Sequence, residues 1–79
     1  MNARKPSPEI RKKVAANLKV LRKARLLTQQ DLAARCGFRR NYVSNVARAT
    51  VNITLASIEE LAKGLGCPEY LLLKWIAAD

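Results

Sequence analysis

Apolar residues recur at helical spacing along most of the chain, in segments separated by glycine, proline and polar residues. The first apolar stripe consists of Ile10, Val14, Leu18 and Leu21. Intervals of four, four and three residues place these side chains on one face of an α-helix. Ser7 offers an N-cap in front of this stripe, Pro8 suits the first helical position, and Glu9 places an acid in the first turn. The pattern predicts a helix from about residue 8 to about Arg25.

Two short helices are predicted next. Thr28 opens the first of them, with Asp31 at the position of a capping-box acid. Gly37 ends it, as a glycine in the left-handed conformation does. The inner side of this helix consists of Leu32, Ala33 and Cys36. Only two residues then separate Gly37 from the next helical run, residues 40–48.

Two more helices complete the predicted fold. Thr54 can cap the fourth helix, which the segment Gly64-Leu65-Gly66 closes. Its apolar stripe consists of Leu55, Ile58, Leu61, Ala62 and Leu65. Pro68 and Glu69 start a fifth helix, expected over about residues 68–77. No alternating strand pattern is present, so we predict an all-α fold, a compact five-helix bundle over residues 8–79 that follows a basic flexible arm, residues 1–7.

The last helix is apolar around most of its circumference, although one side suffices to cover a small core. A second apolar side predicts a homodimer, with residues 68–77 as the dimerisation helix. The residues expected at the interface are Tyr70, Leu72, Leu73, Trp75 and Ile76. The alternative is that the small core absorbs all of this apolar surface.

Charge is distributed unevenly along the 79 residues. The chain has 15 basic and 6 acidic residues and a formal net charge of +9. Residues 1–48 carry 13 of the basic residues and only two acids, Glu9 and Asp31, whereas residues 49–79 are slightly acidic. Such an asymmetry predicts that one part of the protein faces a polyanion, with nucleic acid the leading candidate; the helix-turn-helix pattern described below makes double-stranded DNA the expected partner. A basic surface kept for solubility is the alternative.

Several classes of function are not expected. The chain has no histidine and its carboxylates are scattered, so we do not expect an enzyme, a cofactor or a small-molecule substrate. Cys36 and Cys67 are too few for a disulfide scaffold or a metal site, and are interpreted as buried thiols. No segment approaches the ~18 apolar residues of a membrane span, and no signal peptide is evident. We expect a cytoplasmic protein without a membrane partner.

The second and third helices, joined by a short turn that begins with glycine, form a helix-turn-helix pattern. At about 100° per residue, the third helix turns its apolar side chains inward and an arc of polar residues outward. Arginine can pair with guanine and asparagine with adenine through two hydrogen bonds each. The residues predicted to read bases are Arg39, Arg40, Asn41, Ser44 and Asn45. An ordinary solvated helix face is the alternative, but the arc contains no acid.

These residues also carry a family resemblance. The run TQQDLAARCGFRRNYVSNVARATVNITLASIEELAKGLG resembles the lambda-repressor-like, Cro/phage-repressor type of helix-turn-helix domain, and the similarity spans roughly residues 14–73. Within it, RRNYVSNV followed by NITL most resembles the controller proteins of restriction–modification systems. The pattern is less specific for controllers than for the fold, because antitoxins and prophage repressors share it.

The resemblance implies a set of contacts to DNA phosphates, made by Gln29, Tyr42, Arg48, Thr50 and Asn52. For Gln29 the alternative is an inconsequential polar residue in the first turn. Tyr42 can instead touch a thymine methyl group or pack against the edge of the fold. Asn52 can instead fix a turn.

Two departures from the family pattern concern local geometry. Many relatives have glutamate at the position of Ala47, where it pairs with an arginine at the position of Arg22. Without that partner, we expect Arg22 to turn to solvent, to DNA or to a carbonyl at a helix end. Ala49 replaces a glycine that usually adopts the left-handed conformation, so we expect the third helix to run longer or to end differently.

The resemblance implies a sequence-specific transcription regulator that binds a pseudo-palindromic operator as a homodimer and acts as a restriction–modification controller, with RNA polymerase as a further candidate partner. A prophage repressor or the antitoxin of a toxin–antitoxin pair is the alternative within this class. An alternative of another class is a protein-interaction module that keeps the fold without reading DNA.

Overall fold

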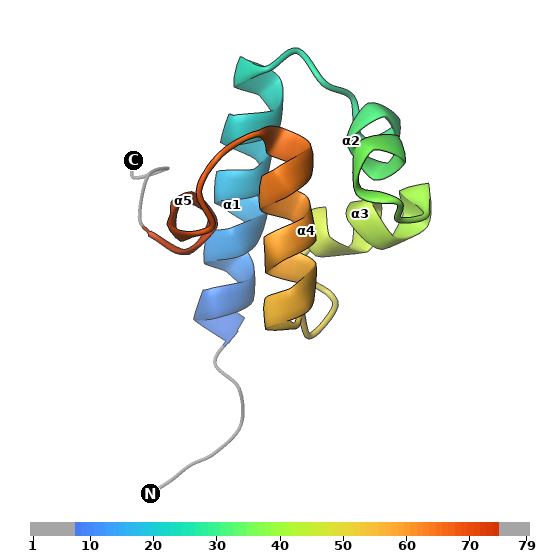
Figure 1. Ribbon diagram of the computed structural model, residues 1–79. Coiled ribbons are helices and arrows are strands. Elements are labelled where there is room, and N and C mark those ends of the chain that lie inside the picture. Colours follow the sequence, from blue (N-terminus) through green and yellow to red (C-terminus); the bar gives the residue numbers. More distant parts are fainter. Residues whose placement is uncertain (1–7, 75–79) are drawn as a thin grey trace, which may run out of the picture.

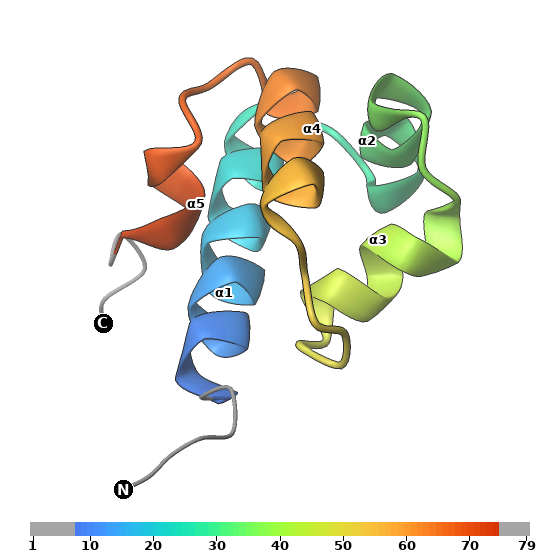
Figure 2. The same ribbon diagram turned by 60° about the horizontal axis from the view of Figure 1, so that its bottom comes forward.

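A computed structural model describes residues 8–74, and within this range it contains five helices and no strand. The helices are α1 (Pro8–Ala24), α2 (Gln29–Cys36), α3 (Arg40–Ala47), α4 (Leu55–Leu65) and α5 (Tyr70–Leu73). α1 and α4 run through the middle of the molecule, with α2 and α3 on one side and α5 on the other (Figures 1 and 2). The predicted all-α bundle is confirmed, whereas the predicted arm, residues 1–7, lies outside the described residues.

The start and the end of α2 are both fixed locally, as the sequence predicts. The Thr28 hydroxyl accepts a hydrogen bond from the Asp31 N–H (3.0 Å), and the Asp31 carboxylate accepts one from the Thr28 N–H (2.9 Å). These two bonds form a complete capping box. They also hold the pKa of the Asp31 carboxyl below its ordinary value. Gly37 ends the helix in the left-handed conformation, with φ at 75°.

Two arginine side chains hold the C-terminal end of α4, a role that sequence reasoning missed. The Arg25 Nε donates a hydrogen bond to the Leu65 carbonyl, and the Arg35 Nη1 donates to the Gly64 carbonyl at 3.4 Å. The last carbonyls of a helix have no partner within it, and cations also interact favourably with that end. Part of the positive charge of the N-terminal half is therefore structural.

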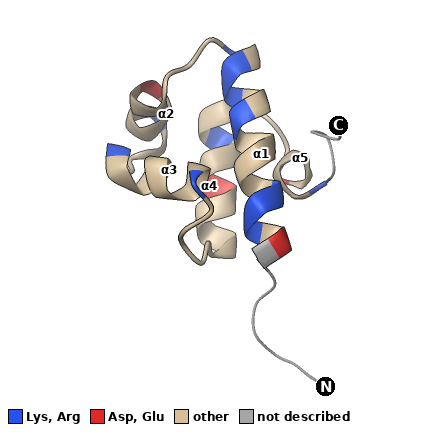
Figure 3. Ribbon diagram, turned by 180° about the vertical axis from the view of Figure 1, so that it is seen from behind, with Lys and Arg blue, Asp and Glu red and all other residues tan. Residues whose placement is uncertain are grey.

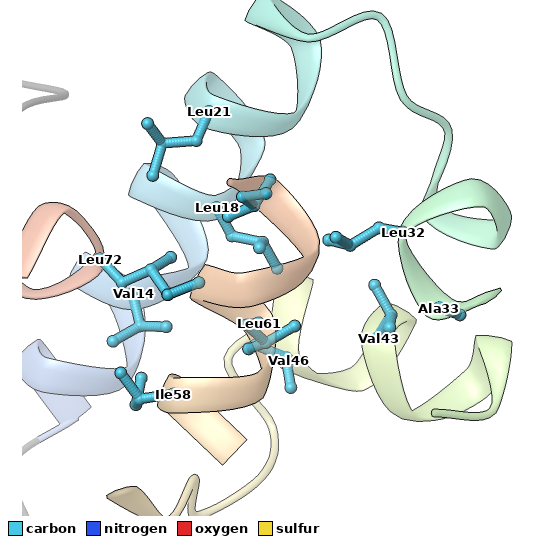
Figure 4. Packing of buried hydrophobic residues seen from close by; sticks show 12 residues of the cluster. Val14, Leu18, Leu21, Leu32, Ala33, Val43, Val46, Ile58, Leu61 and Leu72 are labelled. Atoms are coloured by element: carbon cyan, nitrogen blue, oxygen red, sulfur yellow. The ribbon is translucent and has the colours of Figure 1, made fainter. Parts of the chain in front are cut away.

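The core gathers side chains from all five helices (Figure 4). Its members are Val14, Leu18, Leu21, Leu32, Ala33, Val43, Val46, Ile58, Leu61, Ala62, Leu65 and Leu72. Two residues assigned to the apolar stripes do not belong to it, because Ile10 is 47% exposed and Leu55 is 82% exposed. Each lies in the first turn of its helix, beyond the end of the packed region, where helical spacing no longer brings a side chain into contact with the core.

The packing of α2 against α4 depends on Gly64. A Cβ atom at this position would lie 2.5 Å from the Cys36 sulfur, which is too close for any side chain. Cys36 and Cys67 are both free thiols and are half-buried, whereas the sequence suggested fully buried ones. Partial burial raises the pKa of both thiols.

The end of α3 corrects one expectation. The helix does not run longer: it ends at Ala47, and Ala49 itself adopts the left-handed conformation with φ at 60°. The Ala49 N–H donates to the Val46 carbonyl, and the Thr50 N–H donates to the Asn45 carbonyl. These bonds close the end of the helix and require the turn whichever residue occupies position 49.

Replacing Ala49 by glycine should therefore stabilise the protein. The left-handed conformation costs alanine about 1–2 kcal/mol that glycine avoids. The greater freedom of glycine in the unfolded chain offsets about 0.4–1 kcal/mol of this gain, so the free energy of unfolding should rise by roughly 0.5–1 kcal/mol. Urea denaturation followed by circular dichroism measures this difference. Ala34→Gly, the same change at an exposed position inside α2, should lower stability by about 0.5–1 kcal/mol. A loss of stability in Ala49→Gly would contradict the assigned backbone conformation.

The last helix is much shorter than predicted. α5 ends at Leu73, and Lys74 is extended, with ψ at 166°. The cause is Asn17, a fully buried polar side chain that sequence reasoning missed. Its amide nitrogen donates to the Leu72 carbonyl (3.0 Å) and to the Lys74 carbonyl. In a continuing helix the Leu72 carbonyl would accept from the N–H four residues later. The tail of the predicted helix, with Trp75 and Ile76, lies outside the described residues.

Within the described residues, no helix is long and apolar enough to cross a membrane.

Candidate nucleic-acid interface

α3 lies at an edge of the molecule and packs against α2 and α1 (Figure 2). Val43 and Val46 are buried and fix its inner side, while Ala47 is half-buried. Gly37 provides the left-handed residue with which the chain turns from α2 toward α3. The predicted helix-turn-helix arrangement is present, with one face of the second helix directed away from the core.

Three of the five predicted base-reading side chains are exposed at the beginning of this face. They are Arg39, Arg40 and Asn41, and none of them makes a side-chain hydrogen bond within residues 8–74. Arg39 is the N-cap residue of α3, but its side chain makes no capping bond. Their donors and acceptors remain available to an external partner.

Ser44 and Asn45 differ from these three residues because they are half-buried and already have a partner. The Arg48 guanidinium donates to the Asn45 side-chain oxygen at 2.6 Å, and to the Ser44 hydroxyl at the longer distance of 3.5 Å. The amide N–H groups of Asn45 stay available. This small network fixes the orientation of Arg48 beside the exposed face of α3.

Tyr42 packs against the fold, which is one of the alternatives that the sequence left open. Its ring lies 4.8 Å from the Phe38 ring between centroids, and its hydroxyl donates to the Ser57 hydroxyl at 3.0 Å. A phenol has one proton to donate, and a phosphate only accepts. A phosphate contact by Tyr42 would therefore require its hydroxyl to stop donating to Ser57, whose own hydroxyl can then donate to the phenol oxygen.

Thr50 and Asn52 are exposed in the loop that follows α3. The Thr50 hydroxyl donates to the Asn45 carbonyl at 3.0 Å, and the Asn52 side-chain oxygen accepts from Arg11 at 3.1 Å. The Arg11 contact ties the loop to α1 across 41 residues of sequence. Asn52 thus holds the loop in place while its amide N–H groups face solvent.

Arg22 binds a carbonyl, as one of the expectations had it, but this carbonyl lies in the loop between α1 and α2 and not at a helix end. Its Nη1 donates to the Leu27 carbonyl at 2.6 Å. Beside it lies a surface cavity of about 240 Å³, whose lining residues are Leu18, Lys19, Arg22, Gln29, Ala47 and Arg48. Gln29, a predicted phosphate contact, is the first residue of α2. The cavity therefore joins α1, α2 and the end of α3.

Basic residues occur along α1 and at both ends of α3 (Figure 3). The exposed ones on these two helices and at their ends are Lys12, Lys19, Lys23, Arg39, Arg40 and Arg48. Asp31, an acid of the neighbouring α2, is engaged in its capping box. The surface around α3 therefore combines a positive potential with uncommitted hydrogen-bonding groups.

Only some of the residues predicted for the dimer interface are exposed on the surface. Tyr70 and Leu73 are 62% and 40% exposed, but Leu72 is fully buried in the core, which corrects its assignment to the interface. Trp75 and Ile76 lie outside the described residues. α1, which packs against α5, carries a further exposed apolar side chain, Val20, which is 44% exposed.

Comparison with known proteins supports the interpretation of this fold. A sequence model of the helix-turn-helix family matches residues 18–72. A hypothetical transcription factor of Neisseria meningitidis serogroup B is 40% identical over 65 residues, which cover 82% of this chain and 61% of that protein. The crystal structure of the hypothetical transcription factor from Neisseria aligns with a TM-score of 0.83 at 37% identity, covering 94% of this chain and 86% of the other.

Two restriction–modification controller proteins are also similar. C.AhdI from Aeromonas hydrophila aligns with a TM-score of 0.76 at 35% identity, covering 78% of this chain and 94% of the controller. C.Esp1396I, solved as a tetramer with its natural 35 base-pair operator, aligns with a TM-score of 0.75 at 32% identity, covering 80% and 83%. The predicted resemblance is confirmed: this chain belongs to the helix-turn-helix family and is similar to restriction–modification controller proteins.

Proposed function

We propose that this protein is a sequence-specific DNA-binding transcription regulator of the restriction–modification controller type. The observation that carries the proposal is the state of Arg39, Arg40 and Asn41. They are exposed at the N-terminal end of α3 and have no side-chain partner within the described part of the chain. Fixed helical geometry with free donors and acceptors is what direct reading of base edges requires.

In this mechanism the basic residues of α1 and of the ends of α3 bring the protein to the phosphate backbone. Those contacts orient the domain but carry no sequence information. The beginning of α3 enters the major groove, where Arg40 can donate two hydrogen bonds to a guanine and Asn41 can pair with an adenine. Gln29 and Arg48 contact phosphates beside the groove.

A homodimer fits this mechanism because one short helix reads only a few base pairs. α5 lies on the other side of the molecule from α2 and α3 (Figure 1), and it offers two exposed apolar side chains, Tyr70 and Leu73. Two copies joined there would read half-sites about 34–36 Å apart on a pseudo-palindrome. The operator complex of C.Esp1396I supports DNA as the ligand. A regulator that activates transcription would also contact RNA polymerase.

Selection from random duplex DNA tests the proposal. At ~150 mM salt, non-specific phosphate binding does not dominate, so the protein should enrich a two-fold-related motif with half-sites about one helical turn apart. Binding that enriches no motif would contradict the proposal. It would mean that the charge holds DNA while α3 reads nothing, and it would favour a protein-interaction module.

A further inference from the structure

The cavity between α1, α2 and the end of α3 has an unusual composition. Three of its six lining residues, Lys19, Arg22 and Arg48, are cations, Gln29 is a neutral hydrogen-bonding residue, and none is acidic. A protein surface normally intersperses both signs of charge. Three cations around one concavity concentrate positive potential there and attract an anion.

The position of Arg22 in this wall is fixed without its charge being neutralised. The hydrogen bond to the Leu27 carbonyl, at 2.6 Å, uses one of five guanidinium N–H donors. A carbonyl is a dipole and leaves the formal charge of the guanidinium in place. No ion pair to Arg22 occurs within residues 8–74. The Arg22 guanidinium is therefore fixed in position, keeps its positive charge and has N–H groups left to donate to a ligand.

The size of the cavity suits a phosphate group. Ala47, the last residue of α3, lines the cavity with a single methyl group, and the space measures about 240 Å³. A water molecule occupies about 30 Å³ of the liquid, so a tetrahedral anion and several waters fit. A longer side chain at position 47 would occupy part of this space and still leave room for an anion beside the three cations.

The cavity is also continuous with the face proposed to read bases. Arg48 lines the cavity and at the same time donates to Asn45 and Ser44 on α3. In helix-turn-helix complexes the helix before the recognition helix crosses the phosphate backbone, and Gln29 at the start of that helix, α2, lines the cavity.

We infer that this cavity binds a phosphate group of the DNA backbone, with Lys19 and Arg22 as additional contacts beside Gln29 and Arg48. This inference rests on the proposed function, because it names a further contact of the same DNA complex. The contact sets the affinity and the salt dependence of binding, while sequence preference comes from α3.

Ala47→Glu and Ala47→Gln form a matched pair that tests the inference. The two side chains are similar in size and enter the same part of the cavity, but only glutamate brings a negative charge that can pair with Arg22 and compete with a phosphate. We expect Ala47→Glu to bind the selected duplex roughly tenfold more weakly than Ala47→Gln. The slope of log K against log salt should fall by about 0.9 for each phosphate that the variant no longer neutralises. The preference for the selected duplex over a scrambled one should be equal in both variants.

Arg22→Gln and Lys19→Gln test the same phosphate contact independently. Each should lower the affinity and the salt slope as Ala47→Glu does, and thermal unfolding of each variant establishes that it is folded. If wild-type protein selects a motif, yet Ala47→Glu and Ala47→Gln bind it with equal affinity and equal slope, the cavity inference is overturned and the proposed function stands.

A titration without DNA shows whether the cavity binds free inorganic phosphate instead of a phosphate of the DNA backbone. Inorganic phosphate is titrated into ¹⁵N-labelled Ala47→Gln and Ala47→Glu proteins while the Arg22 Nε–H and Gln29 amide resonances are followed. One outcome would overturn the assignment to DNA: saturable phosphate shifts in Ala47→Gln but not in Ala47→Glu, while the two variants bind DNA with equal affinity. The cavity would then be a site for a free anion. If the wild-type protein selects no motif, the proposed function fails, and the absence of phosphate shifts would then overturn the cavity inference as well.

Discussion

Replacing Arg40 by alanine is expected to remove most of the preference of the protein for its operator. Arg40 is exposed in the first turn of α3 and makes no side-chain hydrogen bond within residues 8–74. A bidentate arginine–guanine pair is worth about 1–3 kcal/mol of discrimination, which corresponds to roughly tenfold or more for each half-site. Fluorescence anisotropy with the selected duplex and with a scrambled duplex measures the ratio of the two affinities.

Two further variants separate base reading from charge. Arg40→Lys keeps the charge but loses the planar fork, so it should keep affinity for the scrambled duplex while losing preference for the selected one. Lys63→Ala removes one exposed positive charge from α4, where Lys63 pairs with Glu60 at 3.6 Å, and should leave the ratio of affinities unchanged. If Arg40→Ala kept the wild-type ratio, Arg40 would not read bases.

Replacing Leu72 by alanine is expected to lower the free energy of unfolding by about 2–5 kcal/mol. Leu72 is fully buried, and its removal creates a cavity in a core shared by all five helices. Small domains are stable by about 5–15 kcal/mol, so this loss is a large fraction of the total. Chemical denaturation over a range of protein concentrations gives the value.

Leu73→Ala is the matched control, because it is the same chemical change at the next position, where the side chain is 40% exposed. In the proposed dimer, the effect of Leu73→Ala grows with protein concentration, since association stabilises the folded state. The effect of Leu72→Ala should be large at every concentration. A small effect of Leu72→Ala that depends on concentration would place Leu72 in the interface instead of the core.

The two variants at neighbouring positions also show why the interface was only partly predictable. A run of apolar residues on one short helix does not reveal which side chain faces the core. Asn17, 55 residues earlier in the sequence, binds the Leu72 carbonyl and fixes how α5 is seated on α1. The same contact ends the helix at Leu73, whereas the uninterrupted apolar sequence predicted a longer one.

The candidate nucleic-acid interface was also only partly predictable from the sequence. The exposure of Arg40 and Asn41 follows from helical periodicity, because Val43 and Val46 determine which side of α3 faces the core. The engagement of Tyr42 with Ser57 and of Asn52 with Arg11 was not predictable. These partners lie 15 and 41 residues apart in sequence and meet only when α4 and α1 are packed.

The sequence by itself determined where the helices begin and end wherever short-range chemistry decides. Thr28 with Asp31, Gly37 and Thr54 act through hydrogen bonds or backbone conformations within a few residues of themselves, so their effects are present in the local sequence. Helical spacing likewise determined the inward and outward faces of α3, because it is a property of a single helix.

Only the tertiary structure decided the rest. It placed Arg25 and Arg35 on the carbonyls at the end of α4, and it left a cationic cavity beside Ala47. The physical reason is that donors and acceptors far apart in the sequence come within hydrogen-bonding distance only after the helices have packed together. Which charges remain free for a polyanion therefore depends on how the helices are packed, and composition alone does not contain that information.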